Sequence, residues 1–351
     1  MADAYPSRES FVLRDIEHVG GIFEEIEPQV YSVLAPEPLG RDLGANITFD
    51  PEALADHPAA QLLAFGNPAL DALFERAQAH NRVARTYVRG LNAHPHNVEV
   101  LAERGLMLAT GTTLRAVSHR PLHHLSALFW FQALFASDEK VQQTYEIGID
   151  LHYRRPARHL SKLIREQLDS DLFGDAPAVA FPEAAVVTLT EAYAQARDEA
   201  TLGVTVSAHE RLNELQRVLT LEITRINRYF DDSRSELDER AARTGAAEDQ
   251  ARFSAQRAAF DREQAGQLAD LRHKMSLSVQ MRLINLLLIW QPKIHIEARL
   301  SMGKFTSDEI TLTYDLQQRR LDAPACPSCG RPTLALRVSG QGRLKCGDCA
   351  L

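Results

Sequence analysis

The sequence has little cysteine, few aromatic residues and no long hydrophobic run. Only four of its 351 residues are cysteines, and aromatic residues make up 7%. So few cysteines exclude a disulfide-rich secreted scaffold. The longest apolar run, Leu286–Trp290, is far shorter than the roughly 20 residues that cross a bilayer. The first residues, MADAYPSRES, lack the basic and apolar regions of a signal peptide. These absences predict a cytoplasmic protein with no membrane partner.

Common catalytic motifs are also missing. The chain contains no G-x-x-x-x-G-K-[ST], no G-x-G-x-x-G after a strand and no G-x-S-x-G. Histidines gather at His94-Pro-His96 and at His123-His124, but adjacent residues of a strand point to opposite faces, so His123 and His124 should not share a metal. A metal-dependent hydrolase or nuclease using His94 and His96 is an alternative. Because no group of residues supports a reaction, we predict that the protein is not an enzyme.

Proline is absent between Pro182 and Pro292, and this segment carries apolar residues at three- and four-residue steps. They are Leu212, Leu215, Leu219, Ile223, Ile226, Phe230 and Leu237, then, after a break at 243–246, Phe253, Phe260, Leu268, Leu271, Met275 and Val279. The pattern predicts an antiparallel coiled-coil hairpin with arms of over thirty residues, the second ending at Pro292. Such a hairpin is either a solvated spacer or an arm that clamps DNA or docks a partner.

The four cysteines form two C-x2-C knuckles near the end of the chain. Cys326 and Cys329 read C-P-S-C, and Cys346 and Cys349 read C-G-D-C after sixteen intervening residues. Two such knuckles are typical of a zinc ribbon, in which four thiolates hold zinc tetrahedrally. Residues 334–338 and 342–345 predict two short strands around a turn. Two disulfides or four unpaired thiols are the alternative. Four thiolates leave no open coordination position, so the zinc would be structural.

The remaining segments alternate helices and strands, which predicts an α+β fold. Asp50-Pro51 and Asn67-Pro68 each combine an N-cap with a proline, a helix start. Residues 112–117, 125–137 and 145–153 read as antiparallel strands, the last with one buried face. The predicted domains are 1–100, mixed α/β; 101–187, strand-rich with a basic segment; 188–291, the helical hairpin; and 292–351, strands and the zinc ribbon.

Charge is unevenly distributed along this chain of net charge −8. Residues 1–60 hold twelve acids and three bases, whereas residues 282–351 hold ten bases and six acids. If residues 151–165 form a helix, four of their five basic residues share one stripe that suits phosphates. Pairing with the acidic N-terminal region is the alternative. The nucleic-acid candidates are Arg154, Arg155, Arg158, Lys162, Arg165, Arg331, Arg337, Arg343 and Lys345.

Two short segments carry a resemblance to a known family. Ala45–Glu52, ANITFDPE, and Gln61–Leu73, QLLAFGNPALDAL, resemble a stretch that follows the motor in bacterial Swi/Snf-family helicases, the RapA/HepA-like proteins, including relatives in phage-defence systems. The order of a strand-rich piece, a charged helical hairpin and terminal cysteine knuckles is also similar. The ATPase lobes of that family are absent here. The resemblance therefore implies a free-standing accessory region whose helicase-type motor is a separate polypeptide.

Together these observations predict a non-enzymatic zinc-ribbon accessory protein that binds DNA, a helicase-type ATPase encoded separately, or both. A scaffold that binds only protein through its coiled-coil hairpin is the alternative.

Overall fold

The computed structural model describes residues 7–37, 39–80, 83–167, 171–243 and 247–350. The fold is α+β, as predicted, with mixed sheets, long helices and a C-terminal four-cysteine cluster. The chain divides into two compact units, one comprising 1–129, 147–193 and 284–351, the other 130–146 and 194–283. Over the described residues, no helix combines the length and apolar character needed to span a bilayer.

The described residues between 7 and 80 form a small sheet with helices around their own core. The elements are α1 (Arg8–His18), β1 (Ile22–Glu27), β2 (Val30–Leu34), α2 (Leu39–Asp42), β3 (Asn46–Thr48), a 3-10 turn (Glu52–Ala55), β4 (Gln61–Leu62) and α3 (Pro68–His80). The strand order is β1-β2-β3-β4. Asn67 caps α3 by accepting a hydrogen bond from Ala69 N at 2.8 Å, which confirms the predicted start. Leu70 and Leu73 of α3 are fully buried with Ile16 and Ile47.

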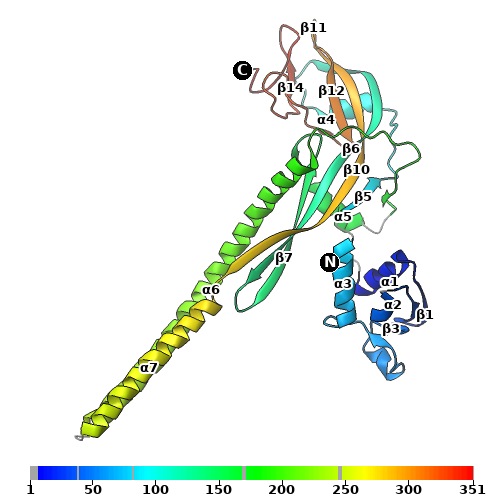
Figure 1. Cartoon of the computed structure of the whole chain (residues 1–351). Helices are drawn as coiled ribbons and strands as arrows, with labels where there is room; N and C mark the ends of the chain where they lie inside the picture. The colour runs from blue at the N-terminus through cyan, green and yellow to red at the C-terminus, as the bar shows by residue number, and fades with distance from the viewer. Residues whose placement is uncertain (1–6, 38, 81–82, 168–170, 244–246, 351) are drawn as a thin grey trace. The chain divides into compact units, whose positions relative to one another are not determined.

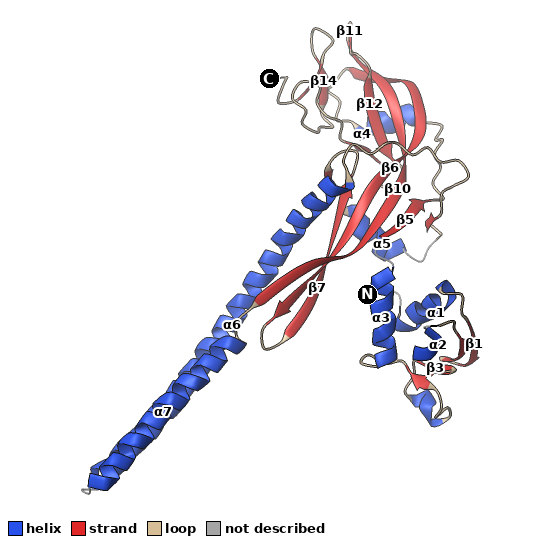
Figure 2. Cartoon of the chain, in the orientation of Figure 1, coloured by secondary structure: helices blue, strands red, loops and turns tan. Residues whose placement is uncertain are grey.

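A larger sheet gathers strands from distant parts of the sequence (Figures 1 and 2). Its first elements are β5 (Val83–Val88), β6 (Thr112–Ala136), β7 (Lys140–Asp150), β8 (Arg155–Pro156) and β9 (Phe173–Gly174), with helices α4 (Val98–Gly105) and α5 (His159–Gln167). Later ones are β10 (Ser278–Met302), β11 (Phe305–Thr306), β12 (Ile310–Asp315) and β13 (Arg320–Asp322). The main order is β13-β12-β10-β6-β7-β8. Residues 112–136 are one strand, where the sequence predicted two.

The predicted continuation of the second long helix to Pro292 is wrong. Helix α7 ends at Lys274, and β10 begins at Ser278 and runs through Pro292. Up to Trp290, β10 pairs in parallel with β5, and from Lys293 it pairs antiparallel with β12. Proline lacks a backbone N–H, so Pro292 lies at the position where β10 changes partner on that edge and interrupts neither ladder.

The hairpin itself is confirmed, with unequal arms. Helix α6 (Leu189–Ala242) has 54 residues and α7 (Ala247–Lys274) has 28, fewer than the thirty expected. Gln264 bonds Asn227, Arg234 bonds Asp261 and Arg257 bonds Asp238. Partner numbers rise along α6 as they fall along α7, so the helices are antiparallel, as Figure 1 shows. The predicted break at 243–246 lies largely outside the described residues, which resume at Ala247.

The two faces of the large sheet differ in chemistry. Ile294, Ile296 and Ala298 of β10 are completely buried in an apolar core. That core also contains Leu336, Val338 and Leu344 of the C-terminal hairpin. On the other face, β10 places Gln291, Lys293 and His295, and the first two are only 1% and 2% exposed. We call this second surface the polar face. It is buried as well, so the prediction of a single buried face around residues 145–153 is wrong.

Candidate metal centre and buried polar face

The four cysteines converge at the end of the chain. Strand β14 (Leu336–Val338) pairs antiparallel with β15 (Leu344–Cys346), and the two knuckles flank this hairpin. The Sγ atoms of all four cysteines lie within 4.8 Å of one another. Gly330, with φ +72°, turns the first knuckle back so that its N–H bonds Cys326 O at 2.8 Å. Glycine adopts left-handed backbone conformations at little cost, so Gly330 suits this turn.

The donor set fits zinc. Zinc–thiolate bonds of about 2.3 Å place two sulfurs of a tetrahedron about 3.8 Å apart. Cys329 Sγ and Cys346 Sγ are 3.7 Å apart, far beyond the roughly 2.05 Å of a disulfide. The backbone N–H of Cys346 donates to Cys326 Sγ at 3.2 Å. The described cysteines are all free thiols, so the disulfide alternative finds no support. The four cysteines would hold the metal, whose role there would be to fix the fold.

Hydrogen bonding prepares some of these sulfurs as thiolates. The backbone N–H of Arg331, with its side chain, lowers the pKa of Cys329 to about 6. Burial alone would raise the pKa of Cys326, yet backbone N–H groups from its own knuckle and from Cys346 lower it overall. Hydrogen bonds to the neighbouring sulfurs raise the pKa of Cys349 to about 12. A divalent cation would offset the repulsion between sulfurs that holds this last proton.

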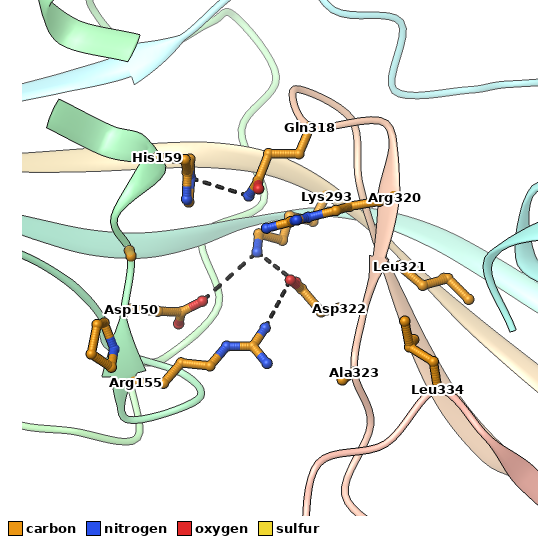
Figure 3. A pocket seen from close by; sticks show the side chains of 12 residues that line it. Asp150, Arg155, His159, Lys293, Gln318, Arg320, Leu321, Asp322, Ala323 and Leu334 are labelled. Atoms are coloured by element: carbon orange, nitrogen blue, oxygen red, sulfur yellow. Dashed lines mark hydrogen bonds and ion pairs between the residues drawn. The ribbon is translucent and has the colours of Figure 1, made fainter. Parts of the chain in front are cut away.

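The second candidate site is a cluster of buried charges on the polar face. Lys293 Nζ lies 2.6 Å from Asp322 Oδ2, 3.3 Å from Asp315 Oδ2 and 3.8 Å from Asp150 Oδ2. Arg155 Nη2 donates to Asp322 Oδ1 at 2.8 Å. The lysine and the three aspartates come from β10, β13, β12 and β7, and each is less than 9% exposed. Figure 3 shows Lys293 between Asp150 and Asp322. We call these five residues the charge cluster.

Each charge in the cluster is held by more than one partner. Asp150 Oδ1 accepts the backbone N–H of His152, and Asp315 Oδ1 accepts those of Gln317 and Gln318. Burial would lower the pKa of Lys293, but the three carboxylates raise it above its ordinary value. Burial also raises the pKa of Asp322, and Lys293 opposes that shift. Removing one partner from such a network leaves a buried charge uncompensated.

Residues of the charge cluster line a pocket of about 320 Å³, and the polar side chains of His159 and Gln318 line the same pocket. His159, at the first turn of α5, has its Nε2 atom 3.2 Å from Gln291 Nε2 and 3.2 Å from Gln318 Nε2. Figure 3 shows the second of these contacts. Since Gln291 Oε1 accepts from Ser126 and Gln318 Nε2 donates to Asp315, both amides present N–H groups to the ring. His159 Nε2 is therefore an acceptor, and the ring is neutral. Burial lowers its pKa accordingly.

The histidines at 123 and 124 point to opposite faces, as predicted. His123 packs edge-on against Tyr87 with ring centroids 5.6 Å apart. His124 stacks on His152 at 3.9 Å and approaches His295 of β10. Among the residues that the structure describes, only the four cysteines bring three or more potential ligand atoms within 4.8 Å. His94 and His96 lie in the loop before α4 and do not join such a group.

The predicted basic stripe does not lie on one helix. Helix α5 begins only at His159, so Arg154, Arg155 and Arg158 precede it. Arg154 pairs with Glu191 at 3.7 Å, and Lys162 pairs with Glu166 at 3.7 Å. Arg155 belongs to the charge cluster, where it pairs with Asp322, so it does not contribute to an exposed basic surface. Arg158 and Arg165 are exposed, and Arg165 also donates to Ser161 O. The backbone turns at Arg154, which has φ +50°, and the segment then forms the short strand β8.

Two of the ribbon's basic residues share the outer side of its hairpin. Arg337 and Lys345 are directly opposite in the β14–β15 register, whereas the flanking pairs Leu336–Cys346 and Val338–Leu344 point into the core. Arg343 is exposed, and Arg331 pairs with Asp348 at 3.0 Å.

The chain matches no family model, no curated protein and no solved structure. Function therefore has to be inferred from the side chains themselves.

The charge cluster is the feature that the sequence did not reveal. Gln291, Lys293, His295 and Glu297 alternate with apolar residues, a pattern that ordinarily marks a solvent-facing strand surface. The available signal was one acidic residue opposite one basic residue, since Asp315 pairs with Lys293 in register. Recognising this pair requires the register of β10 against β12, and a local sequence pattern does not reveal that register.

Proposed function

We propose that this chain is a non-enzymatic accessory protein whose zinc-stabilised ribbon binds DNA, alone or together with a helicase-type partner. The observation that carries the proposal is the cation pair on the ribbon. Arg337 and Lys345 lie opposite each other on the outer face of two short strands. Like charges at directly opposed positions destabilise a strand pair. A bound polyanion would offset that repulsion by attracting both cations.

The surroundings of this pair support a phosphate ligand. Arg337, Ser339, Gly340 and Lys345 line one pocket of about 360 Å³. In the part of the chain that the structure describes, neither cation forms an ion pair within 4 Å. Arginine binds phosphate through two parallel N–H groups, and lysine adds a second positive charge. Two closely spaced cations suit consecutive phosphates of a nucleic-acid backbone, which bind without regard to sequence.

Exposed basic residues near α5 would extend the contact. Arg154, Arg158, Lys162 and Arg165 are exposed, whereas Arg155 is committed to the charge cluster. The order of parts that resembles RapA/HepA-like helicases supports a helicase-type ATPase as the protein partner. In this proposal the zinc centre holds the ribbon strands in register, and no residue performs a reaction.

Binding to single- and double-stranded DNA across a salt series, measured by fluorescence anisotropy with the zinc-loaded protein, tests the proposal. We expect affinity to fall steeply with salt. The Arg337→Ala/Lys345→Ala variant should bind more weakly and lower the log–log salt slope by about 2, because two phosphate contacts are lost.

A matched control removes the same charge from the acidic N-terminal part. Arg14→Ala/Arg41→Ala should leave the salt slope unchanged, since both residues are exposed among acids. Binding that is absent at moderate salt, or equal loss in both variants, would contradict the proposal.

A protein-only scaffold is the second candidate, favoured by apolar residues exposed on α6. Leu202 and Leu221 are 71% and 70% exposed, and Tyr229 is 64% exposed. Side chains of this size on a long helix suit contact with a protein partner. If the wild-type protein fails to bind DNA yet co-purifies with a stable partner, and Leu221→Lys/Tyr229→Lys abolishes that association, the scaffold is the better account.

A further inference from the structure

Arg331, the second residue after the first cysteine knuckle, has its backbone tied to that knuckle. The backbone N–H of Cys326 donates to Arg331 O at 2.9 Å, and Ala325 forms an antiparallel bridge with Pro332. The backbone N–H of Arg331 donates in turn to Cys329 Sγ. Both ends of the C-P-S-C turn therefore contact this one residue, and its side chain starts from a fixed point beside the sulfurs.

The side chain of Arg331 connects the two knuckles. It donates to Cys329 Sγ, and its Nη2 atom lies 3.0 Å from Asp348 Oδ2. Asp348 belongs to the second knuckle, whose turn is closed by a hydrogen bond from Ala350 N to Cys346 O at 3.1 Å. A guanidinium carries five N–H donors in one plane, so it can serve a sulfur and a carboxylate at the same time. One side chain thus bridges a sulfur of the first knuckle and the turn of the second.

The sulfur that Arg331 contacts belongs to the most accessible of the four cysteines. Cys326 and Cys346 are 1% and 5% exposed, Cys349 is half-buried and Cys329 is exposed. A chelator or an electrophile that approaches from solvent therefore meets Cys329 first. The guanidinium lies at the position where exchange of the metal would begin.

The ion pair between Arg331 and Asp348 contributes little stability by itself. The two side chains are 62% and 71% exposed, and ion pairs at such positions are worth at most about 1 kcal/mol. The larger effect acts on the sulfurs. Four thiolates around one divalent cation carry an excess of negative charge, and an N–H donor offsets part of it. Donors in the outer shell of a metal site typically change its affinity by about 10- to 100-fold.

We infer that Arg331, held in place by Asp348, is a positioning residue of the metal centre that slows the loss of zinc through Cys329. The guanidinium would then serve the metal centre, and Arg337 and Lys345 would provide the ribbon's phosphate contacts. The inference rests on zinc binding by the four cysteines and does not depend on DNA binding.

The rate of zinc release tests the inference. Full-length, zinc-loaded protein is mixed with an excess of the chelating dye 4-(2-pyridylazo)resorcinol, and release is followed by absorbance. We expect Arg331→Gln to release zinc about 10-fold faster than the wild type. Asp348→Asn should give a smaller acceleration, and the double variant should be no faster than Arg331→Gln, because both changes act through one contact.

Two further arginine variants separate the contact from the charge. Arg343→Gln removes the same charge from an exposed position of the same ribbon and should release zinc at the wild-type rate. Arg331→Lys keeps the charge but lacks the planar set of donors, so it should release zinc faster than the wild type.

Two measurements report on the sulfur itself. With Co²⁺ in place of zinc, the sulfur-to-metal absorption band should move to longer wavelength in Arg331→Gln, because a hydrogen bond to the sulfur is lost, and should not move in Arg343→Gln. Iodoacetamide labelling of the zinc-loaded wild type, mapped by mass spectrometry, should modify Cys329 before the other cysteines.

The outcomes distinguish this inference from the proposed zinc ribbon. Equal release rates in Arg331→Gln and the wild type, an unmoved Co²⁺ band, or first labelling at another cysteine would overturn the inference and leave the ribbon intact. Full-length protein that binds no zinc would overturn both.

Discussion

At the scale of residues, the polar face contains many buried polar side chains, most of which have hydrogen-bond partners. Ser126, Gln291 and His159 form a chain of hydrogen bonds that ends at Gln318 and Asp315. In a medium of low polarity each such group is costly when left unpaired. The arrangement thus depends on His159 staying neutral, so that its Nε2 atom can accept from two amides.

This dependence predicts a sensitivity to acid. Burial lowers the pKa of His159, with Lys293 and Arg320 adding to the shift and Asp315 and Asp150 opposing it. A lowered folded-state pKa contributes stability above the unfolded value near 6.5 and loses it as the pH falls. Between pH 6.5 and 5.5 we expect the wild type to lose up to about 1 kcal/mol of unfolding free energy through this residue.

Denaturant titrations at both pH values measure the effect. His159→Gln keeps an acceptor but cannot be protonated, so its loss of stability should be smaller by that amount. His119→Gln, at an exposed position, should behave as the wild type. Equal losses in wild type and His159→Gln would contradict the assignment.

At the scale of elements, the charge cluster connects four strands that are distant in sequence. Lys293 on β10 reaches Asp150 on β7, Asp315 on β12 and Asp322 on β13. Register accounts for only one of these contacts, the pairing of Lys293 with Asp315. The other two depend on how β7 and β13 are placed around β10.

Removing the cation should therefore destabilise the sheet. Lys293→Met keeps the aliphatic volume but removes the cation that three buried carboxylates share, and of these only Asp322 keeps an ion pair among the described residues, with Arg155. We expect a loss of about 3–5 kcal/mol. Lys304→Met, at an exposed turn, is the control and should cost under about 0.5 kcal/mol. Adding Asp315→Asn to Lys293→Met should restore part of the loss. Chemical denaturation followed by far-ultraviolet circular dichroism measures all three, and a neutral Lys293→Met would rule out the cluster as a structural tie.

At the scale of the whole molecule, the ribbon is not an appended module. Leu336, Val338 and Leu344 belong to the same apolar core as Ile294 and Ile296 of β10. Met107 N donates to Leu334 O at 2.9 Å, which joins the ribbon to the segment after α4. Disorder of the ribbon would consequently expose one face of the large sheet.

Removal of zinc should therefore lower the stability of the unit that contains the ribbon and leave the stability of the other unit unchanged. Chelation of zinc is expected to cost at least about 5 kcal/mol in the unit that contains the ribbon, a fall of roughly 10–20 °C in Tm for a domain of this size. The two tryptophans report separately, because Trp290 lies in that unit and Trp130 in the other. With Trp130→Phe, fluorescence melting should shift on chelation, while helical circular dichroism from α6 and α7 persists. An unchanged Trp290 transition would show that the cysteines are not structurally coupled to the sheet.

The parts of the fold that follow from local sequence were predictable. Cysteine spacing identified the ribbon, the apolar period located the hairpin, and Asn67-Pro68 placed the start of α3. These features depend on residues within a few positions of one another, so the sequence alone carries them. Tertiary structure decided the rest. Residues 278–290 form a strand because β6 supplies a partner, with β5 as a parallel partner on the other edge over Leu286–Trp290, and this pairing outweighed an apolar spacing compatible with helix. Lys293, Asp315 and Asp322 meet because β10, β12 and β13 are neighbours in the sheet, and Arg155 of β8 reaches Asp322 only in the folded chain. Burial of a second sheet face depends on which distant strands meet there, and no local periodicity encodes that choice.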